Sequence, residues 1–593
     1  MDFSTLSELY SKLENESSGN KLREILAEFF LSTNKEEPTL LPTLTYLSLG
    51  KIAPDYKNSV LGIAEKLLLK AIAKAANKGS KETMTLMQKD GDVGLVAQKL
   101  LKVKPMTLVP VAKLTVEELW KTLHKIKSIS GNKSQDTKEK ILISLFQKTT
   151  GSEAKYLARI ILQNMRLGVA DMTVLDALAI AFTGEKSNKK ILERAYNVCP
   201  DLAVIASSLV ELGLEGIGDI PIKVGRPIRV MLAQRVASLS GVSEKISGEL
   251  QVEAKYDGER IQIHKDSSGK ITLYSRRMED ITYQYPDVQS FLKQEIAKTA
   301  QSYILEGEIM ALDLEKGGHK NFQTLMKRKR KTEIEKHAKQ IPVAIYCFDI
   351  LLLNEKNLMN ESFTVREKAL ESILKKKDRI RRIEFIKTNE VSEAKAYFDK
   401  MIARGEEGVI IKSQGEGSLY KAGARDWNWI KWKKDYNHEL VDTFDLVVIG
   451  AFYGKGKRSG TYGSLLCATY NHETDTFESI SKLGTGLTDK MLEEIPFLLR
   501  KHEVDKKPAR CNVKKEMTPD LWFEPYLVVE VIAAEITKGG LHTCSMHSVM
   551  NKSTGKKEMK GYALRFPRLI QIRADKKPED GTYSEEIVGI ANN

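Results

Sequence analysis

A lysine directly after an apolar segment is the strongest candidate for a reactive group in this sequence. Lys255 opens the run K-Y-D-G-E-R (residues 255–260), which follows the strand-like segment LQVEA. A lysine amine has a reference pKa near 10.4, so only about one in a few thousand is an unprotonated nucleophile at neutral pH. Nearby cations lower the pKa of a lysine and also attract phosphate. The run therefore suits covalent transfer of a phosphate-linked group to Lys255.

Charged residues recur downstream in the segments SRRMEDIT, LEGEIMA, YCFDIL, EEGVIIK and RDWNWIKWKKDY. Because alternate residues of a strand share a face, Glu306 and Glu308 project from one side of their strand, and Lys431 and Lys433 from one side of theirs. Transfer of a phosphoryl group needs carboxylates for metal and cations for phosphate around one cleft. We expect that convergence here, with Glu308 as the functional glutamate and Glu306 as a structural or solvated one.

The elements that must position these residues change along the chain. Residues 1–215 repeat apolar side chains at helical spacing, as in LGIAEKLLLKAIAKAA, and predict an all-α domain. Residues 216–440 mix short apolar runs with helical stretches and predict an α+β core, in which RIQIHKDSSGKITLYSR forms a hairpin. Residues 441–593 alternate apolar runs with Gly-rich turns, as in a small β-barrel. The expected fold class is a multi-domain α+β chain.

Composition excludes several classes of protein. With 42% hydrophobic and 29% charged residues, the chain is neither a disordered tail nor a fibre. No apolar run approaches the ~20 residues that cross a bilayer, and the N-terminal segment lacks a signal-peptide pattern, so we expect a cytoplasmic protein with no membrane contact. The five cysteines form no C-x-x-C pair, and we expect them to be reduced and structural.

The net charge of +14 is unevenly distributed, because residues 51–200 alone carry +12. A basic stretch of this kind fits a surface for the phosphate backbone of a nucleic acid. It fits an ordinary solvated surface equally well, so charge alone leaves both interpretations open.

The motifs, in this order, closely resemble those of the covalent nucleotidyltransferases, and specifically the ATP-dependent DNA ligases of the replicative type found in archaea and eukaryotes. The resemblance spans nearly the whole chain. It includes NMRLGVADMTVLDALA (residues 164–179), similar to the DNA-gripping segment of that family, and RADK (residues 573–576), similar to its closing R-x-D-K element. It implies a helical DNA-binding domain at 1–215, an adenylation domain at 216–440 and an oligonucleotide-binding (OB) fold at 441–593.

The activity implied by this resemblance is the sealing of nicks in duplex DNA during replication, repair and recombination. Lys255 would attack the α-phosphate of ATP and form lysyl-AMP, the AMP would pass to the 5′-phosphate of the nick, and the 3′-hydroxyl would displace it. The implied cofactors are ATP and Mg²⁺, with Mn²⁺ as an alternative. The implied partner is nicked double-stranded DNA, with the replication sliding clamp as a further candidate. One chain suffices to surround DNA, so a monomer is expected.

The resemblance also implies a role for each residue that contacts the adenosine end of the nucleotide. Glu253 would face the adenine amino group and Phe348 would stack on the base. Arg260 and Arg276 would contact ribose and phosphate, and Glu308 would bind the ribose and help to hold metal.

The remaining implied roles concern metal and phosphate. Glu407 would be the principal metal carboxylate. The cations that would hold the α-phosphate, the 5′-phosphate of the nick and the leaving pyrophosphate are Arg425, Lys431, Lys433, Arg573 and Lys576. Where many relatives read S-R-N, this chain has Ser275-Arg276-Arg277, which leaves the role of Arg277 open.

Several conspicuous segments have a simpler structural interpretation. We expect Trp427, Trp429 and Trp432 to be core residues, because aromatic residues in strands usually pack inward. His542, Cys544 and His547 lack a second cluster and are expected in a loop rather than at a metal. LREILAEFF (22–30) resembles a clamp-binding peptide but fits a buried helix face better, and KPMTLV (104–109) is an equally weak clamp candidate. MKRKRK (326–331) is expected on a solvated face or against DNA.

Three rival functions remain to be distinguished. An RNA ligase or mRNA-capping enzyme shares the chemistry, but the large helical domain before Lys255 argues against it. An NAD-dependent ligase would be expected to have a cysteine-rich zinc module, which this sequence lacks. A catalytically silent scaffold for the replication clamp would form no covalent adduct with ATP.

Overall fold

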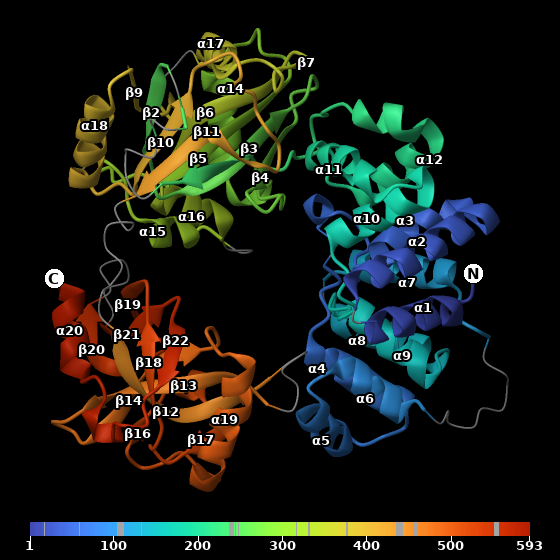
Figure 1. Cartoon of the computed structure of the whole chain (residues 1–593), viewed down its shortest axis with the longest axis vertical. Coiled ribbons are helices and arrows are strands. Elements are labelled where there is room, and N and C mark those ends of the chain that lie inside the picture. Colours follow the sequence, from blue (N-terminus) through green and yellow to red (C-terminus); the bar gives the residue numbers. More distant parts are fainter. Residues whose placement is uncertain are drawn as a thin grey trace. The chain divides into compact units, whose positions relative to one another are not determined.

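The computed structural model in Figure 1 describes the chain except for residues 17, 59, 103–111, 132, 237–241, 243, 244, 247, 316, 330–332, 375–377, 434–442, 455–460, 551–556 and 593. The side chains of residues 88, 235, 323, 433 and 592 are also outside the described part. Contacts divide the chain into two compact units, one formed by residues 1–68 and 107–437 and the other by residues 69–106 and 438–593. No helix in the described part is long and apolar enough to span a bilayer.

The described part of the chain up to residue 218 is mainly helical, as the sequence predicts. Its α-helices are α1 (Phe3–Asn15), α2 (Gly19–Glu36), α3 (Leu41–Leu47), α4 (Glu65–Ala75), α5 (Ser80–Asp90), α6 (Val93–Leu100), α7 (Val116–Ser128), α8 (Ser134–Gln147), α9 (Gly151–Ile161), α10 (Asp171–Thr183), α11 (Lys189–Val198) and α12 (Leu202–Gly218).

Local side-chain hydrogen bonds explain where several of these helices begin. The Thr115 side chain accepts a hydrogen bond from the Glu118 backbone N–H at the start of α7, and Thr150 with Glu153 forms a reciprocal capping box at the start of α9. LREILAEFF lies in α2, where Leu22, Leu26 and Phe30 are buried, which confirms the core interpretation of that segment.

Two β-sheets form the α+β core. One sheet has the strand order β1 (Leu232–Arg235), β11 (Arg425–Lys433), β10 (Gly408–Ser413), β2 (Leu250–Lys255), β9 (Phe385–Thr388). The other has the order β4 (Ile271–Ser275), β3 (Glu259–Lys265), β5 (Tyr303–Ala311), β6 (Val343–Leu353), β7 (Lys356–Asn357), with β8 (Ile380–Arg382) paired to β6. The predicted hairpin is confirmed as β3 and β4, which pair antiparallel from Ile261 and Ser275 to Lys265 and Ile271.

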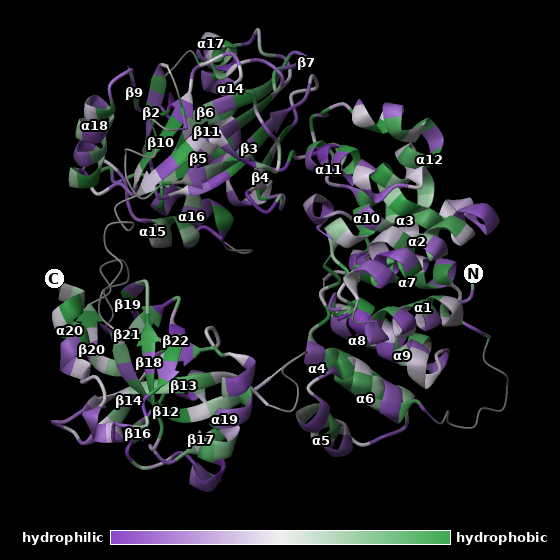
Figure 2. Ribbon diagram, viewed as in Figure 1, coloured by the Kyte–Doolittle hydropathy of each residue, from purple (hydrophilic) through white to green (hydrophobic). Residues whose placement is uncertain are grey.

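The cores of this region follow from the apolar runs in its strands. One hydrophobic cluster combines residues of β2, β10 and β11 with residues of β6, so it lies between the two sheets. A second covers the other face of the six-stranded sheet and includes residues of α14 (Pro286–Glu295) and α17 (Phe363–Ile373). The region also contains α15 (Phe322–Met326), α16 (Ile334–Gln340) and α18 (Val391–Ala403). Figure 2 shows apolar residues along the central strands and hydrophilic residues on many connecting loops.

Strands dominate the C-terminal region, as predicted. One sheet contains β12 (Phe444–Tyr453), β13 (Tyr462–Asn471), β14 (Thr476–Leu483), β15 (Glu503–Val504), β16 (Cys511–Asn512), β17 (Leu521–Phe523), β18 (Val528–Ile532) and β22 (Arg568–Ile572). A smaller sheet contains β19 (Glu535–Gly539), β20 (Cys544–Met550) and β21 (Lys557–Arg565), and the helices are α19 (Asp489–Leu499) and α20 (Ser584–Asn592). All five cysteines of the chain are free and buried, which confirms their expected structural role.

Candidate active site

Lys255 lies where the chain crosses from one sheet to the other. It is the last residue of β2, and four residues later Glu259 begins β3. The crossing is tight at Gly258, because a β-carbon there would lie 2.3 Å from the carbonyl oxygen of Ile309 in the neighbouring strand. A residue with a side chain would therefore displace the crossing, which explains the glycine in the K-Y-D-G run.

The ammonium group of Lys255 forms an ion pair with the carboxylate of Glu407. The backbone N–H of Glu407 donates to the carbonyl of Lys255 at 3.2 Å, and the next residue, Gly408, pairs with Lys255 across β2 and β10. Both side chains are partly exposed, 22% for Lys255 and 26% for Glu407. The pair is therefore anchored by its backbone and open to solvent on one side.

A cavity of about 680 Å³ opens beside this pair, a size typical of small-molecule sites. The residues of both sheets contribute to its walls. Of the predicted site residues, those that line it are Glu253, Lys255, Arg260, Arg276, Glu308, Phe348, Glu407, Arg425 and Lys431. The structure thus brings together side chains that are up to 178 positions apart in the printed sequence, from Glu253 to Lys431.

One part of the lining is apolar and carries two buried charges. Phe348 and Trp429 supply aromatic surface, and the Glu253 carboxylate pairs with the ammonium group of Lys412 at 2.9 Å. Lys412 also donates to the Phe348 carbonyl at 2.9 Å, and its ammonium lies 4.6 Å from the centre of the Trp429 ring. Burial lowers the pKa of Lys412, and the nearby Glu253 carboxylate opposes that shift.

Lys412 ends the EEGVIIK segment, but no role at the site was predicted for it from the sequence. The signal was strand alternation: Lys412 shares a face with Ile410, and both line the cavity.

Glu306 and Glu308 separate into a structural and a cavity-lining residue. Glu306 is fully buried, accepts from Arg260 at 2.8 Å and from the Tyr420 hydroxyl at 2.9 Å, and is absent from the cavity lining. Glu308 lines the cavity. Burial raises the pKa of Glu308 to about 7, while the charges of Lys255 and Arg260 pull it down. The two glutamates therefore differ in chemistry as well as in position.

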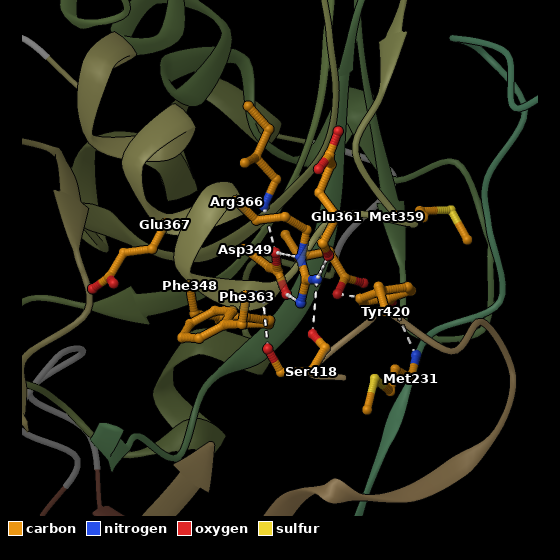
Figure 3. Close-up of polar contacts among 12 residues, drawn as sticks. Met231, Phe348, Asp349, Met359, Glu361, Phe363, Arg366, Glu367, Ser418 and Tyr420 are labelled. Carbon is orange, nitrogen blue, oxygen red and sulfur yellow. Dashed lines mark hydrogen bonds and ion pairs between the residues drawn. The ribbon is translucent and has the colours of Figure 1, made fainter. Parts of the chain in front are cut away.

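A buried ion pair supports the strand that carries Phe348. Figure 3 shows Arg366 against Asp349, with Phe348 and Phe363 beside them. Arg366 donates to the Asp349 carboxylate at 2.8 and 3.2 Å and to the carbonyls of Glu361 and Ser418 at 2.7 and 3.0 Å. Both charged side chains are fully buried. This pair ties β6 to two loops and so fixes the wall behind the cavity.

Exposed cations gather at another part of the lining. Arg276 and Arg277 follow β4 in a turn in which Met278 has a left-handed φ of 65°, and the Arg277 backbone N–H donates to the Ser275 hydroxyl at 3.3 Å. Both arginines line the cavity. Arg425 also lines it and donates to the carbonyl of Ala233 at 2.9 Å. Lys433 ends β11, and its side chain lies outside the described residues.

Three expectations about individual residues are wrong. Cys544 and His547 do not lie in a loop, because both belong to strand β20. Trp429 and Trp432 are buried, as expected, but Trp427 is 38% exposed. The pairing of β11 with β1 is irregular here, and the pairing with β10 begins only at Trp429, so no neighbouring strand covers Trp427. Within MKRKRK, Arg328 is not solvated, because it is only 1% exposed. Its guanidinium pairs with Asp287 at 2.6 Å and packs over the Tyr285 ring. Residues 330 and 331 of that segment lie outside the described part, as does KPMTLV.

Arg573 and Lys576 lie in the second unit. The Asp445 carboxylate pairs with Arg573 at 3.2 Å and with Lys576 at 2.6 Å. Arg573 pairs in addition with Asp575 at 2.7 Å, which lowers the pKa of the Asp575 carboxyl to about 2. The two cations of the RADK segment are thus held close together by carboxylates.

The carboxylates that line the cavity can be compared with the ligands that Mg²⁺ uses in proteins. Among the described residues, no three His, Cys, Asp or Glu side chains are grouped so that they hold a metal by themselves. Mg²⁺ in nucleotide sites is commonly held by one or two carboxylates together with substrate phosphates. Glu308 and Glu407 both line the cavity, so the residues present fit that kind of site.

Comparison with known proteins covers most of the chain. Residues 2–179, 230–433 and 458–576 match the family models described as DNA ligase N terminus, ATP dependent DNA ligase domain and ATP dependent DNA ligase C terminal region. A DNA ligase of Saccharolobus shibatae is 42% identical over 100% of this chain and 97% of its own length, and DNA ligase 2 of Thermofilum pendens is 41% identical over 99% and 97%. A solved structure titled Pmar-Lig_PreS3 has a similar fold, with a TM-score of 0.53 and 17% identity over 96% of this chain and 99% of that one.

Proposed function

This chain belongs to the ATP-dependent DNA ligase family, whose activity is the sealing of nicks in DNA, and from that premise we propose that Lys255 is the nucleophile that carries AMP. The observation that supports this assignment is the position of Lys255 at the crossing of two sheets, in contact with Glu407 and on the wall of a cavity of about 680 Å³. The K-x-D-G pattern occurs once in the sequence, at Lys255.

The first step forms a bond between Nζ of Lys255 and the α-phosphorus of ATP, and it breaks the bond from that phosphorus to the bridging oxygen of pyrophosphate. The amine gives up its proton before the attack. Since Lys255 and Glu407 are both partly exposed, the proton passes to water in the cavity. Pyrophosphate leaves and lysyl-AMP remains.

The adenosine end of the nucleotide is assigned to the apolar part of the cavity. Phe348 supplies a ring for stacking on the base, and Glu253 faces the base amino group with Lys412 beside it. Arg260 and Arg276 contact ribose and phosphate, and Glu308 accepts from a ribose hydroxyl. Buried partners of Arg260 and Glu253 hold these side chains in place before the nucleotide binds.

The phosphate end is assigned to the cations. Arg425, Lys431 and Lys433 hold the α-phosphate and then the 5′-phosphate of the nick, while Arg573 and Lys576 bind the pyrophosphate that leaves. Glu407 and Glu308 are the carboxylates that would hold Mg²⁺ or Mn²⁺, which when bound neutralises charge on the phosphates. The AMP then passes from Lys255 to the 5′-phosphate, and the 3′-hydroxyl displaces it to close the strand.

We also propose an organisation and a set of partners for the whole chain. They comprise a helical DNA-binding domain at 1–215, an adenylation domain at 216–440 and an OB-fold domain at 441–593, acting as a monomer inside the cell on nicked duplex DNA. The replication sliding clamp is a further candidate partner. Phosphate contacts rather than base contacts should dominate DNA binding, because sealing must not depend on sequence.

Strand joining by Lys255→Arg tests the assignment. The variant should fail to seal a 5′-phosphorylated nick with ATP, because a guanidinium remains protonated and is not a nucleophile. It should still join a nick whose 5′-phosphate is already adenylated, since that step no longer needs lysyl-AMP. Sealing of the ordinary nick at the wild-type rate would contradict the proposal.

A further inference from the structure

Asp445 occupies the centre of the charged cluster at the end of the chain, yet neither the sequence motifs nor the cavity points to it. It is the second residue of β12, and it pairs in register with Glu530 of β18. Glu530 pairs in turn with Gln571 of β22, two residues before Arg573. Figure 1 shows β12, β18 and β22 in the strand-rich C-terminal region. The sheet therefore brings Asp445 beside Arg573 from 128 positions away.

The Asp445 carboxylate contacts both cations of the RADK segment. One oxygen accepts from Arg573 at 3.2 Å, and the other accepts from Lys576 at 2.6 Å. The carboxylate is only 16% exposed, whereas Arg573 and Lys576 are 23% and 31% exposed. A shielded acid therefore bridges two cations that remain open to solvent.

The cations keep donors for a ligand while they are held. An ammonium group has three N–H donors and a guanidinium has five. Lys576 gives one N–H to Asp445, and each guanidinium nitrogen of Arg573 donates to Asp445 or Asp575. Donors thus remain on both side chains for phosphate oxygens. Pyrophosphate and the outer phosphates of ATP are multiply charged anions that suit two adjacent cations.

The backbone of Asp445 is fixed independently of its carboxylate. Its N–H donates to the Thr582 hydroxyl at 2.9 Å, and its carbonyl accepts from the Thr582 N–H at 2.8 Å. A change of the carboxylate to an amide therefore leaves two anchors of the strand in place. The contribution of the charge can be separated from the contribution of the fold.

We propose that Asp445 is a positioning residue that assembles Arg573 and Lys576 into one binding element for the pyrophosphate portion of ATP. This inference rests on the proposed function, because it takes Arg573 and Lys576 as the residues that bind the leaving pyrophosphate. Asp445 itself touches no substrate. It acts through the two cations, which it holds at a fixed separation.

Asp445→Asn in the full-length protein tests the proposal through both directions of the first step. The amide keeps the shape of the side chain but loses its charge, so the two cations lose their common anchor. Formation of lysyl-AMP at subsaturating ATP should slow by about ten- to hundredfold, the usual effect of misplacing a group that positions substrate. Removal of AMP from lysyl-AMP by added pyrophosphate should slow to the same extent. Joining of a pre-adenylated nick should stay within about twofold of the wild type.

Two further variants make the result specific. Asp475→Asn is the matched control, because Asp475 is an acid of the same region whose partners among the described residues are Arg510, at 2.5 Å, and Tyr470. All three rates should stay at the wild-type level. Asp445→Glu keeps the charge and should restore part of the pyrophosphate-driven reversal. The double variant Asp445→Asn with Lys576→Gln should be less impaired than the product of the two single effects, because both changes act on one element.

Each other result overturns the inference. Wild-type rates for Asp445→Asn in both directions of the first step would show that the cations need no common anchor. Faster adenylation would show that the carboxylate competes with phosphate instead of positioning its ligands. An equal loss in all three reactions, including the joining of a pre-adenylated nick, would show a structural role only. If Arg573→Ala leaves adenylation unchanged, the proposed function of Arg573 fails, and this outcome is distinguishable from failure of the inference about Asp445.

Discussion

Glu306 and Glu308 show what burial does to two identical side chains on one face of β5. Glu306 has three protein donors and does not line the cavity, whereas Glu308 lines the cavity near Lys255 and Arg260. Burial raises the pKa of Glu308 to about 7, so its charge changes within the working range of pH. Glu306 therefore serves as a structural ion-pair partner, whereas Glu308 is a group whose ionisation depends on its surroundings.

Glu308→Gln should change the pH dependence of adenylation. Above pH 7 the wild-type carboxylate is mostly ionised, and the variant should be slower by roughly ten- to hundredfold, the value of a hydrogen bond to a charged group. As the pH falls through 7, the wild-type group is protonated, so the ratio of the two rates should shrink. Single-turnover labelling with ATP between pH 6 and 8.5 measures that ratio, and a constant ratio would contradict the assignment.

The same raised pKa predicts the sign of an effect on stability. A carboxyl group whose pKa is raised by folding favours the folded state below its ordinary pKa, and this contribution is lost as the pH rises through about 7. Glu308→Gln stays neutral throughout. Relative to the wild type, the variant should therefore gain thermal stability on going from pH 6 to pH 8.5. A loss over that range would show that the ionised carboxylate is stabilised in the fold.

The sequence predicted well which residues line the site, but it predicted poorly which side chains contact one another. Nine predicted site residues line one cavity because their motifs lie in or next to strands of the two sheets. Lys412 was given no role, because strand alternation indicates its face but not its burial against Glu253 and three aromatic rings. Arg328 was misjudged for a similar reason: a charged run gives no sign that one member packs over Tyr285.

The crossing between β2 and β3 is the element on which the site depends most. Gly258→Ala should shift it, because the added β-carbon meets the Ile309 carbonyl at 2.3 Å, and overpacking of this kind costs about 1–3 kcal/mol. The rate of lysyl-AMP formation should fall by a large factor while the melting temperature falls only slightly. The reason is that Lys255 lies only three residues from the shifted glycine. Gly417→Ala is the matched control, because nothing lies within 4 Å of its added β-carbon. Equal behaviour of the two variants would contradict the tight crossing.

The buried ion pair of Arg366 and Asp349, behind Phe348, gives a prediction about stability. Arg366→Met should leave the Asp349 carboxylate buried without its partner, at a cost of about 3–5 kcal/mol. Arg404→Met removes an exposed partner of Glu384 and should cost at most about 1 kcal/mol. Thermal unfolding of the full chain, with and without ATP, compares them. A small effect of Arg366→Met would mean that Asp349 has another means of neutralisation.

Elements were more predictable than their pairing. Helical spacing correctly predicted the helices before residue 218, and the alternation of RIQIHKD and KITLYSR predicted the β3–β4 hairpin. The order of strands in the two sheets depends on contacts between distant segments, such as β2 with β10, and is not contained in any local pattern. Trp427 illustrates the limit, because an irregular register removed it from the core.

For the whole molecule, charge predicts how binding to DNA depends on salt. A protein that neutralises six to ten phosphates loses roughly 10³- to 10⁵-fold in affinity between 50 and 200 mM salt. With a net charge of +14, this chain should lose at least about 10³-fold on a nicked duplex, to the same extent for unrelated base sequences. Labelling of the enzyme with ATP should change far less over that range. An affinity for nicked DNA that is insensitive to salt would contradict a backbone-based mode of binding.

The most direct test of the central claim is mass spectrometry of the protein after incubation with ATP and Mg²⁺. One AMP should be added per chain, and fragmentation should place it on Nζ of Lys255. Addition of pyrophosphate should remove it. An AMP found on another residue, or no covalent addition to a folded protein that binds ATP, would contradict the account.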